Sequence, residues 1–106
     1  MNTLTTAQMM SELTITFPAL WKRPLSEFGA DYAGQEGVWT GGDGDKMQDG
    51  DPIFCSLANG EPPYNGSVHE GFEAWLANRG WGVDRYDGET YFLVPEAYFH
   101  CQEFGV

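Results

Sequence analysis

The stretch from Ser67 to Val94 constrains the fold of this 106-residue chain most strongly, because its pattern is typical of a helix followed directly by a β-hairpin. Ser67 and Glu70 have the spacing of a capping box, which marks a helix start. Gly80 suits the left-handed residue that ends a helix. The sequence therefore predicts a main helix over residues 67–80, with an apolar stripe formed by Val68, Phe72, Trp75 and Leu76.

Residues 81–94 predict a β-hairpin, with Asp87-Gly88 as a two-residue type I′ turn. Such a turn pairs Val83 with Phe92. It directs one set of side chains into the core, namely Trp81, Val83, Phe92 and Val94. The opposite face carries Asp84, Tyr86, Glu89 and Tyr91. An isolated hairpin is marginally stable in water, so further strands are expected upstream.

The N-terminal segment, residues 1–34, is predicted to be helical. Thr5 and Gln8 form a second capping-box pattern, which predicts a helix from about Thr6 to Leu13. A short second helix is expected from Pro18 to Trp21, because proline is well tolerated at the first position of a helix.

Residues 35–58 predict a first hairpin, with strands around Val38-Trp39 and at Ile53–Leu57 joined by a glycine- and aspartate-rich connection. Together these elements predict one α+β domain. Its four-stranded, mostly antiparallel sheet of two hairpins would have its helices packed on one face.

The net charge of −11, from sixteen acidic against five basic residues, restricts the partners of such a domain. It argues against direct binding to nucleic acid or to an anionic membrane surface, and it favours a basic protein partner. Neither a signal-peptide pattern nor a membrane-spanning run is apparent, so a cytoplasmic location is expected. Cys55 and Cys101 lack metal-like spacing and are expected to be reduced thiols, with a disulfide as the alternative.

Motifs for catalysis or cofactor binding are missing from the sequence. It contains no Gly-x-Ser-x-Gly, no phosphate-binding loop and no dinucleotide fingerprint. His69-Glu70 begins like a zinc-protease motif, but Glu73 occupies the position of the second histidine. We therefore expect a non-enzymatic protein without a cofactor or metal site, and an exposed His69 at the start of the helix.

The acidic residues gather in two groups along the chain and are the candidate partner-binding residues: Asp31, Glu36, Asp43, Asp45, Asp49, Asp51, Asp84, Asp87 and Glu89. Alternate residues of an extended strand lie about 6.6 Å apart, so such carboxylates can form a row. A basic nucleic-acid groove can accept that row in place of phosphates. In size, charge and its aspartate-rich run, the chain resembles small acidic phage-encoded inhibitors, including anti-CRISPR proteins. The resemblance implies an inhibitor that imitates nucleic acid.

Three alternatives stay open at the level of sequence. The charge can belong to an acidic domain whose carboxylates bind no specific partner. The Asp43–Asp51 loop can bind calcium, although Met47 and Phe54 occupy positions where an EF-hand has ligands. The chain can also be an obligate subunit whose interface contains exposed aromatic residues, for which the candidates are Trp39, Tyr64, Tyr86 and Tyr91.

Overall fold

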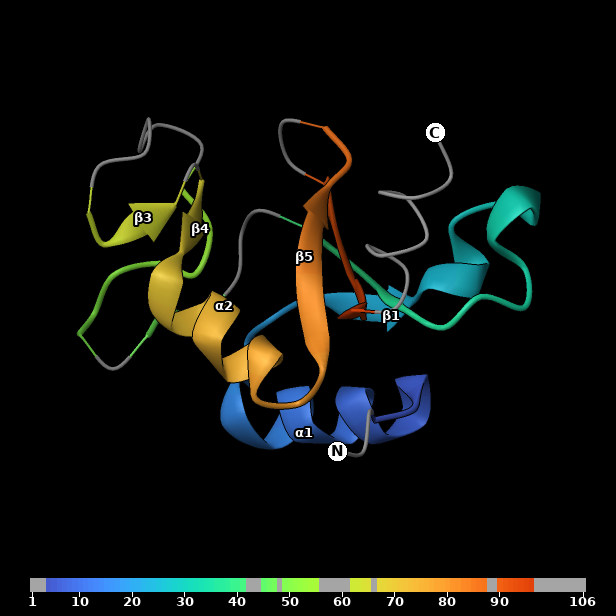
Figure 1. Ribbon diagram of the computed structural model, residues 1–106, viewed down its shortest axis with the longest axis horizontal. Helices are drawn as coiled ribbons and strands as arrows, with labels where there is room; N and C mark the ends of the chain where they lie inside the picture. Colours follow the sequence, from blue (N-terminus) through green and yellow to red (C-terminus); the bar gives the residue numbers. More distant parts are fainter. Residues whose placement is uncertain are drawn as a thin grey trace.

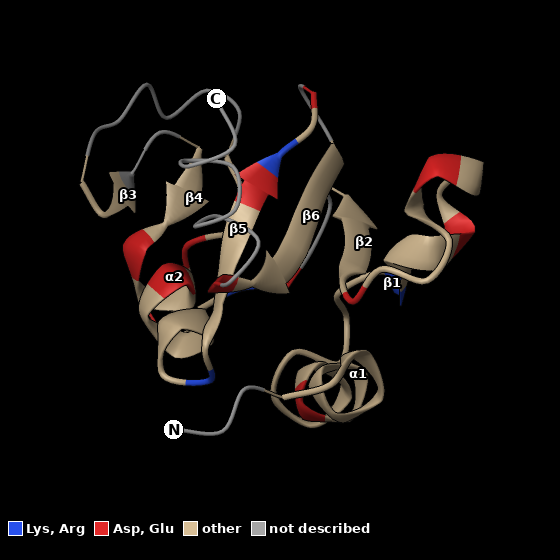
Figure 2. Cartoon of the chain, turned by 45° about the vertical axis from the view of Figure 1, so that its right-hand side comes forward, with Lys and Arg blue, Asp and Glu red and all other residues tan. Residues whose placement is uncertain are grey.

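The computed structural model describes residues 4–41, 45–47, 49–55, 62–65, 67–87 and 90–96. Its main feature is a four-stranded antiparallel sheet (Figure 1), and its strands, labelled in Figure 2, lie in the order β1-β2-β6-β5. The strands are β1 (Lys22–Pro24), β2 (Val38–Gly41), β5 (Trp81–Arg85) and β6 (Thr90–Pro95). A two-stranded sheet is formed by β3 (Tyr64–Asn65) and β4 (Val68–His69). The predicted α+β class and the four-stranded antiparallel sheet are confirmed.

Helix α1 (Thr6–Thr16) begins as its sequence predicts. The Thr5 hydroxyl accepts a hydrogen bond from the Gln8 amide, and the Gln8 side chain accepts one from the Thr5 amide, at 3.2 and 2.8 Å. The helix continues beyond the predicted end at Leu13 and through the β-branched residues up to Thr16. Thr14 is accommodated because its hydroxyl donates to the Met10 carbonyl at 2.8 Å. None of the described helices is long and apolar enough to cross a bilayer.

The expected short helix from Pro18 to Trp21 is wrong, since these residues turn and then enter β1. The first hairpin predicted over residues 35–58 is also wrong in its pairing, because β2 lies between β1 and β6. The described part of the second predicted strand, Ile53 to Cys55, contributes one isolated bridge, from Phe54 to Val68. Ile53 and Phe54 are nevertheless buried in the core. Their apolar character therefore reflects burial of an irregular segment, which sequence patterning does not distinguish from a strand.

Helix α2 (Glu70–Ala77) starts two residues later than predicted, with His69 as its N-cap instead of Ser67. Ser67 is buried, and its hydroxyl oxygen accepts a hydrogen bond from the Tyr91 hydroxyl at 2.8 Å. Val68 and His69 pair with β3 and thus hold an extended conformation. The predicted Ser67–Glu70 capping box is therefore absent, because pairing with β3 takes the residues that would have formed the first turn.

The hairpin of β5 and β6 exists, but its register is shifted by one residue from the predicted one. Val83 lies opposite Leu93 instead of Phe92. A longer connection permits this register, since the amides of Tyr86 and Asp87 both donate to the Thr90 carbonyl. Residues 88 and 89 of the expected turn lie outside the described residues. A shift of one residue exchanges the faces of a strand, so Phe92 and Val94 lie on the face opposite to the one predicted.

The sheet has a buried cluster on each face. The helix-covered face packs against α1 and α2, and its core includes Met9, Leu13, Phe72, Leu76, Trp81, Tyr91 and Leu93. Packing of both α-helices on one face agrees with the prediction. The opposite side, here named the aromatic face, consists of Leu25, Phe92 and Val94 with Phe28, Tyr32 and Trp39 packed against them.

Two short 3₁₀ helices, η1 (Leu25–Glu27) and η2 (Ala30–Tyr32), supply the cover of the aromatic face. Their segment is cyan in Figure 1 and lies at the opposite end of the molecule from β3 and β4. It is joined to α1, because Glu36 accepts hydrogen bonds from the amide and hydroxyl of Thr6. The Gly37 amide in turn donates to the Thr6 hydroxyl at 2.8 Å.

Candidate functional site

The described members of the predicted partner-binding acids come from separate parts of the chain. Asp43 and Glu89 lie outside the described residues. The other seven belong to three separate parts of the chain: the η2 region, the segment 45–55, and β5 with its turn. The first two of these lie at opposite ends of the view in Figure 1 (cyan and green), and the acids coloured in Figure 2 are spread over several elements. The described acids of this set therefore do not all lie along one strand.

Several of these carboxylates are engaged by the protein itself. The two hydrogen bonds that Glu36 accepts from Thr6 lower the pKa of Glu36, and the bond from the hydroxyl has the larger effect. The two carboxylate oxygens of Asp45 accept from the amides of Ala19 and Lys46, at 3.0 and 2.8 Å. These acids satisfy backbone donors that have no partner in a helix or sheet, which is an ordinary role for aspartate in loops.

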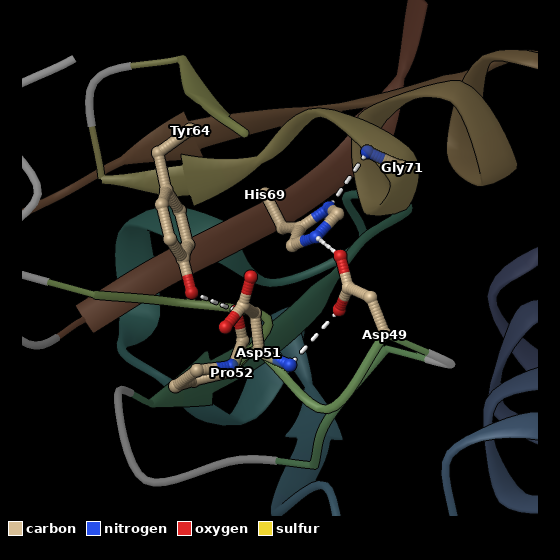
Figure 3. A network of polar contacts seen from close by, with 6 residues as sticks. All are labelled: Asp49, Asp51, Pro52, Tyr64, His69 and Gly71. Carbon is tan, nitrogen blue, oxygen red and sulfur yellow. Dashed lines mark hydrogen bonds and ion pairs between the residues drawn. The ribbon is translucent and has the colours of Figure 1, made fainter. Parts of the chain in front are cut away.

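The structure brings Asp49 and Asp51 together with His69 (Figure 3). His69 is only 6% exposed, so the expectation of an exposed histidine is wrong. Its Nε2 lies 2.8 Å from Asp49 Oδ2, and its Nδ1 accepts from the Gly71 amide at 2.9 Å. The Asp51 amide donates to Asp49 Oδ1 at 2.9 Å. The pKa of Asp49 is lowered, mainly by the Asp51 amide and then by His69.

These contacts determine the tautomer of His69. A nitrogen that accepts from an amide carries no proton, so the proton of the neutral ring lies on Nε2 and is donated to Asp49. Both ring nitrogens are thus in use. One caps α2 and the other holds the segment that contains Asp49, which leaves neither nitrogen free to act as a general base.

Tyr64 closes the other side of this network. Its ring meets the His69 ring edge to face, with centroids 5.4 Å apart, and its hydroxyl donates to the Pro52 carbonyl at 2.7 Å. Burial raises the pKa of Tyr64, and the nearby negative charge of Asp51 adds to this effect. Tyr64 is therefore a neutral hydrogen-bond donor that fixes the loop.

Asp49, Asp51 and His69 also offer one ligand atom each within 4.8 Å of one another, which is close enough to surround a metal ion. The chemistry of His69 opposes that use. A histidine that binds metal through Nε2 normally donates its Nδ1 proton to an acceptor, whereas Nδ1 here faces the Gly71 amide. Metal binding would therefore break the cap of α2.

The calcium alternative meets a similar difficulty. Both oxygens of Asp45 and both oxygens of Asp49 accept hydrogen bonds from protein donors. A calcium site instead needs several oxygens directed at one point. The arrangement of Asp45, Asp49 and Asp51 thus supports a folded acidic loop better than a cation site; Asp43 lies outside the described residues.

A second candidate site lies on the aromatic face, where two large rings reach the solvent. Trp21 is 44% exposed and Tyr86 is 52% exposed. They are connected through Trp39 and Phe28 in a series of edge-to-face contacts, with successive centroid distances of 5.1, 4.9 and 4.9 Å. We call these four residues the aromatic row.

The expectation that the four candidate interface aromatics are exposed is correct only in part. Tyr86 is exposed, and Trp39 and Tyr64 are partly buried, but Tyr91 is 1% exposed and stacks on Phe54 in the core. The register shift explains this error, because it turns Tyr91 to the helix-covered face. The sequence did not indicate Trp21, because its segment has the pattern of a short helix. The single described cysteine, Cys55, is a free thiol, and Cys101 lies outside the described residues.

Comparisons with known proteins do not identify the chain: it matches no protein-family model, no curated protein and no solved structure.

Proposed function

We propose that this chain is a non-enzymatic interaction protein that binds and blocks a basic, nucleic-acid-binding partner, in the manner of small phage-encoded inhibitors such as anti-CRISPR proteins. The observation that carries the proposal is the location of the charge. The chain has a net charge of −11, and the buried polar residues of the described part are Thr40, Ser67 and His69. Every described carboxylate thus reaches the surface, where it contributes to a negative potential.

The distribution of the acids determines which form of blocking the geometry supports. Acids spread over several elements attract a basic surface from many orientations and accelerate encounter. Attraction of this kind does not depend on a regular, phosphate-like spacing of the acids. The proposal is therefore electrostatic competition for a basic surface, with specificity supplied by other contacts.

The chemistry of the described residues supports a binding function over catalysis. The only described cluster of histidine and carboxylates is centred on His69, whose two nitrogens are both engaged. A catalytic base needs a lone pair directed at substrate. This cluster instead has the hydrogen bonds of a structural joint between α2 and the segment 49–52.

The test is capture of partners on the immobilised chain at about 50 mM and about 200 mM salt. We expect basic proteins to be retained at the lower concentration and largely lost at the higher one. Adding the free chain to a captured protein should reduce its binding to nucleic acid. A triple variant that combines Asp31→Asn, Glu70→Gln and Glu96→Gln removes three exposed acids and should weaken capture. Retention that does not respond to salt would contradict the electrostatic mechanism.

A further inference from the structure

We infer that the aromatic row is a docking site for an extended, arginine-bearing segment of the basic partner. The inference rests on the proposed function and names the surface and the chemical group that it recognises. Four observations carry it: the continuity of the rings, their support from the core, the acid beside them and their position on the face with the lighter cover.

The rings of the row are held in place before any partner binds. Phe28 contacts Phe92 and Tyr32 at centroid distances of 4.9 and 5.5 Å, and Tyr86 contacts Phe92 at 5.0 Å. Phe92 is itself 4% exposed. Ordering side chains on binding costs free energy, so rings that are already packed bind with a smaller entropic loss.

The strand register places the row and an acid on the same face of the sheet. Arg23 of β1 lies opposite Trp39, Trp39 lies opposite Phe92, and Phe92 lies opposite Asp84. Directly opposed residues of an antiparallel sheet point to the same side. The partly exposed Asp84 therefore stands on the face that carries Tyr86, two residues further along the chain.

The charges at the two ends of the row differ. At the Trp21 end, Arg23 is paired with Glu27 at 3.3 Å, so its charge is locally offset. At the Tyr86 end, Asp84 adds negative charge to the aromatic face, whereas the neighbouring Arg85 lies over the Tyr91 ring of the other face. A cationic ligand is thus favoured over an anionic one across this face.

Arginine matches this combination better than other side chains. Its planar guanidinium stacks on aromatic rings and also forms paired hydrogen bonds with a carboxylate. An extended segment repeats its side chains on one side about every 6.6 Å, which is longer than the 4.9–5.1 Å between neighbouring ring centroids but shorter than the whole row. Arginines at alternate positions can therefore contact successive parts of the surface.

The experiment measures binding of a synthetic arginine–glycine repeat peptide to the full chain by calorimetry and tryptophan fluorescence. Peptides of equal length with lysine or glutamine in place of arginine serve as comparisons. We expect the arginine peptide to bind most tightly and the glutamine peptide to show no binding. Trp21→Ala and Tyr86→Ala should each weaken arginine-peptide binding by about two- to tenfold. Tyr86→Phe keeps the ring and should retain most of the affinity.

Two matched controls distinguish binding at the aromatic row from nonspecific attraction of a cationic peptide to the acidic protein. Ile15 is 77% exposed on α1, so Ile15→Ala removes an exposed apolar side chain from another element and should leave binding unchanged. Asp84→Asn and Glu70→Gln change the net charge equally, but Glu70 lies on α2. Asp84→Asn should therefore weaken binding more than Glu70→Gln.

The outcomes distinguish this inference from the proposed function. Equal weakening by Asp84→Asn and Glu70→Gln, with no effect of the ring substitutions, overturns the docking site and leaves electrostatic binding intact. Failure of every cationic peptide, together with failure to capture a basic partner, overturns both. Self-association that is abolished by Trp21→Ala or Tyr86→Ala would assign the row to a second copy of the chain and overturn the arginine site.

Discussion

The helix-covered face and the aromatic face of the same sheet differ in how completely their rings are covered. On the helix-covered face, Phe72, Trp81 and Tyr91 are at most 1% exposed. On the aromatic face, Trp21 and Tyr86 retain about half of their exposure, at 44% and 52%. The two faces share the strands β5 and β6, so strand sequence alone does not account for the difference.

The covering elements explain this difference. Helices α1 and α2 contain eleven and eight residues and each directs an apolar side at the sheet, whereas η1 and η2 contain three residues each. A short turn cannot shield as many rings as a helix. The helix-covered face is therefore the main source of stability. The aromatic face keeps exposed rings that can contact another molecule.

The largest expected effect comes from removing a ring on the helix-covered face. Phe72→Ala should lower the free energy of unfolding by roughly 3–5 kcal/mol, since Phe72 is fully buried and leaves a cavity. Tyr86→Ala, on the aromatic face, should cost about 1 kcal/mol or less. Chemical denaturation of both variants measures the contrast. Equal costs would mean that both faces contribute alike to stability.

Gly37 tests how closely the cover of the aromatic face fits. A Cβ at this position would lie 2.7 Å from Leu25 Cδ2 and 3.3 Å from the Leu93 carbonyl oxygen. Gly37→Ala should therefore destabilise the protein by about 1–3 kcal/mol. A Cβ at Gly29 would meet no atom within 4 Å, so Gly29→Ala is the control and should be close to neutral in thermal unfolding. A neutral Gly37→Ala would show that the cover is loose.

The Ser67–Tyr91 hydrogen bond tests the buried polar contact of the helix-covered face. Ser67→Ala leaves the buried Tyr91 hydroxyl without its partner and should cost about 1–3 kcal/mol. Tyr91→Phe should cost a similar amount, and the double variant should cost less than the sum of the two. A double-mutant cycle in urea measures this. Additive effects would contradict the bond and restore the interpretation of Ser67 as a helix cap.

Lowering the pH is expected to have the smallest effect on stability. It acts at Glu36, where α1 is hydrogen-bonded to the segment that covers the aromatic face. Hydrogen bonds from Thr6 lower the pKa of Glu36 below its usual value of 4.5. The ionised form is the one bound in the folded state, so its contribution is complete above pH 4.5 and is lost as pH falls through the lowered pKa. Glu36→Gln should be less stable than the unsubstituted protein at neutral pH.

That difference should shrink in acid, as thermal unfolding at neutral pH and at about pH 3 can show. Glu70→Gln is a control for removing an exposed acid. A Glu36→Gln deficit that persists unchanged in acid would assign the effect to something other than the carboxylate charge.

The parts of the fold that were predictable have local causes. The Thr5–Gln8 capping box marks α1 because all its contacts lie within one turn. Alternation from Trp81 to Tyr86 and the turn signal at Asp87-Gly88 mark residues 81–94 as a hairpin. Their register was not predictable, because it depends on a connection longer than the Asp87-Gly88 turn signal indicates.

The candidate sites were less predictable than the fold. The net charge follows directly from the number of acidic residues. The contact between Asp49 and His69 could not be predicted, because these residues lie 20 positions apart in the sequence. The aromatic row joins Trp39 of β2 to residues that lie next to β1, η1 and β5, namely Trp21, Phe28 and Tyr86. The sequence gave no separate indication of Trp21. For the His69 site, the sequence offered Gly71, two residues further along, as a hint. Without a Cβ, Gly71 lets the His69 ring approach the Gly71 backbone.

The sequence by itself determined the α+β class, the start of α1, the presence of a C-terminal hairpin and the negative charge, because each follows from composition or from contacts between near neighbours. Tertiary structure alone decided the strand order, the N-cap of α2 and the face on which Phe92 and Tyr91 lie. The reason is competition between local and distant partners. Ser67 has the pattern of a helix cap, but in the folded protein it accepts the hydrogen bond of Tyr91, 24 residues away.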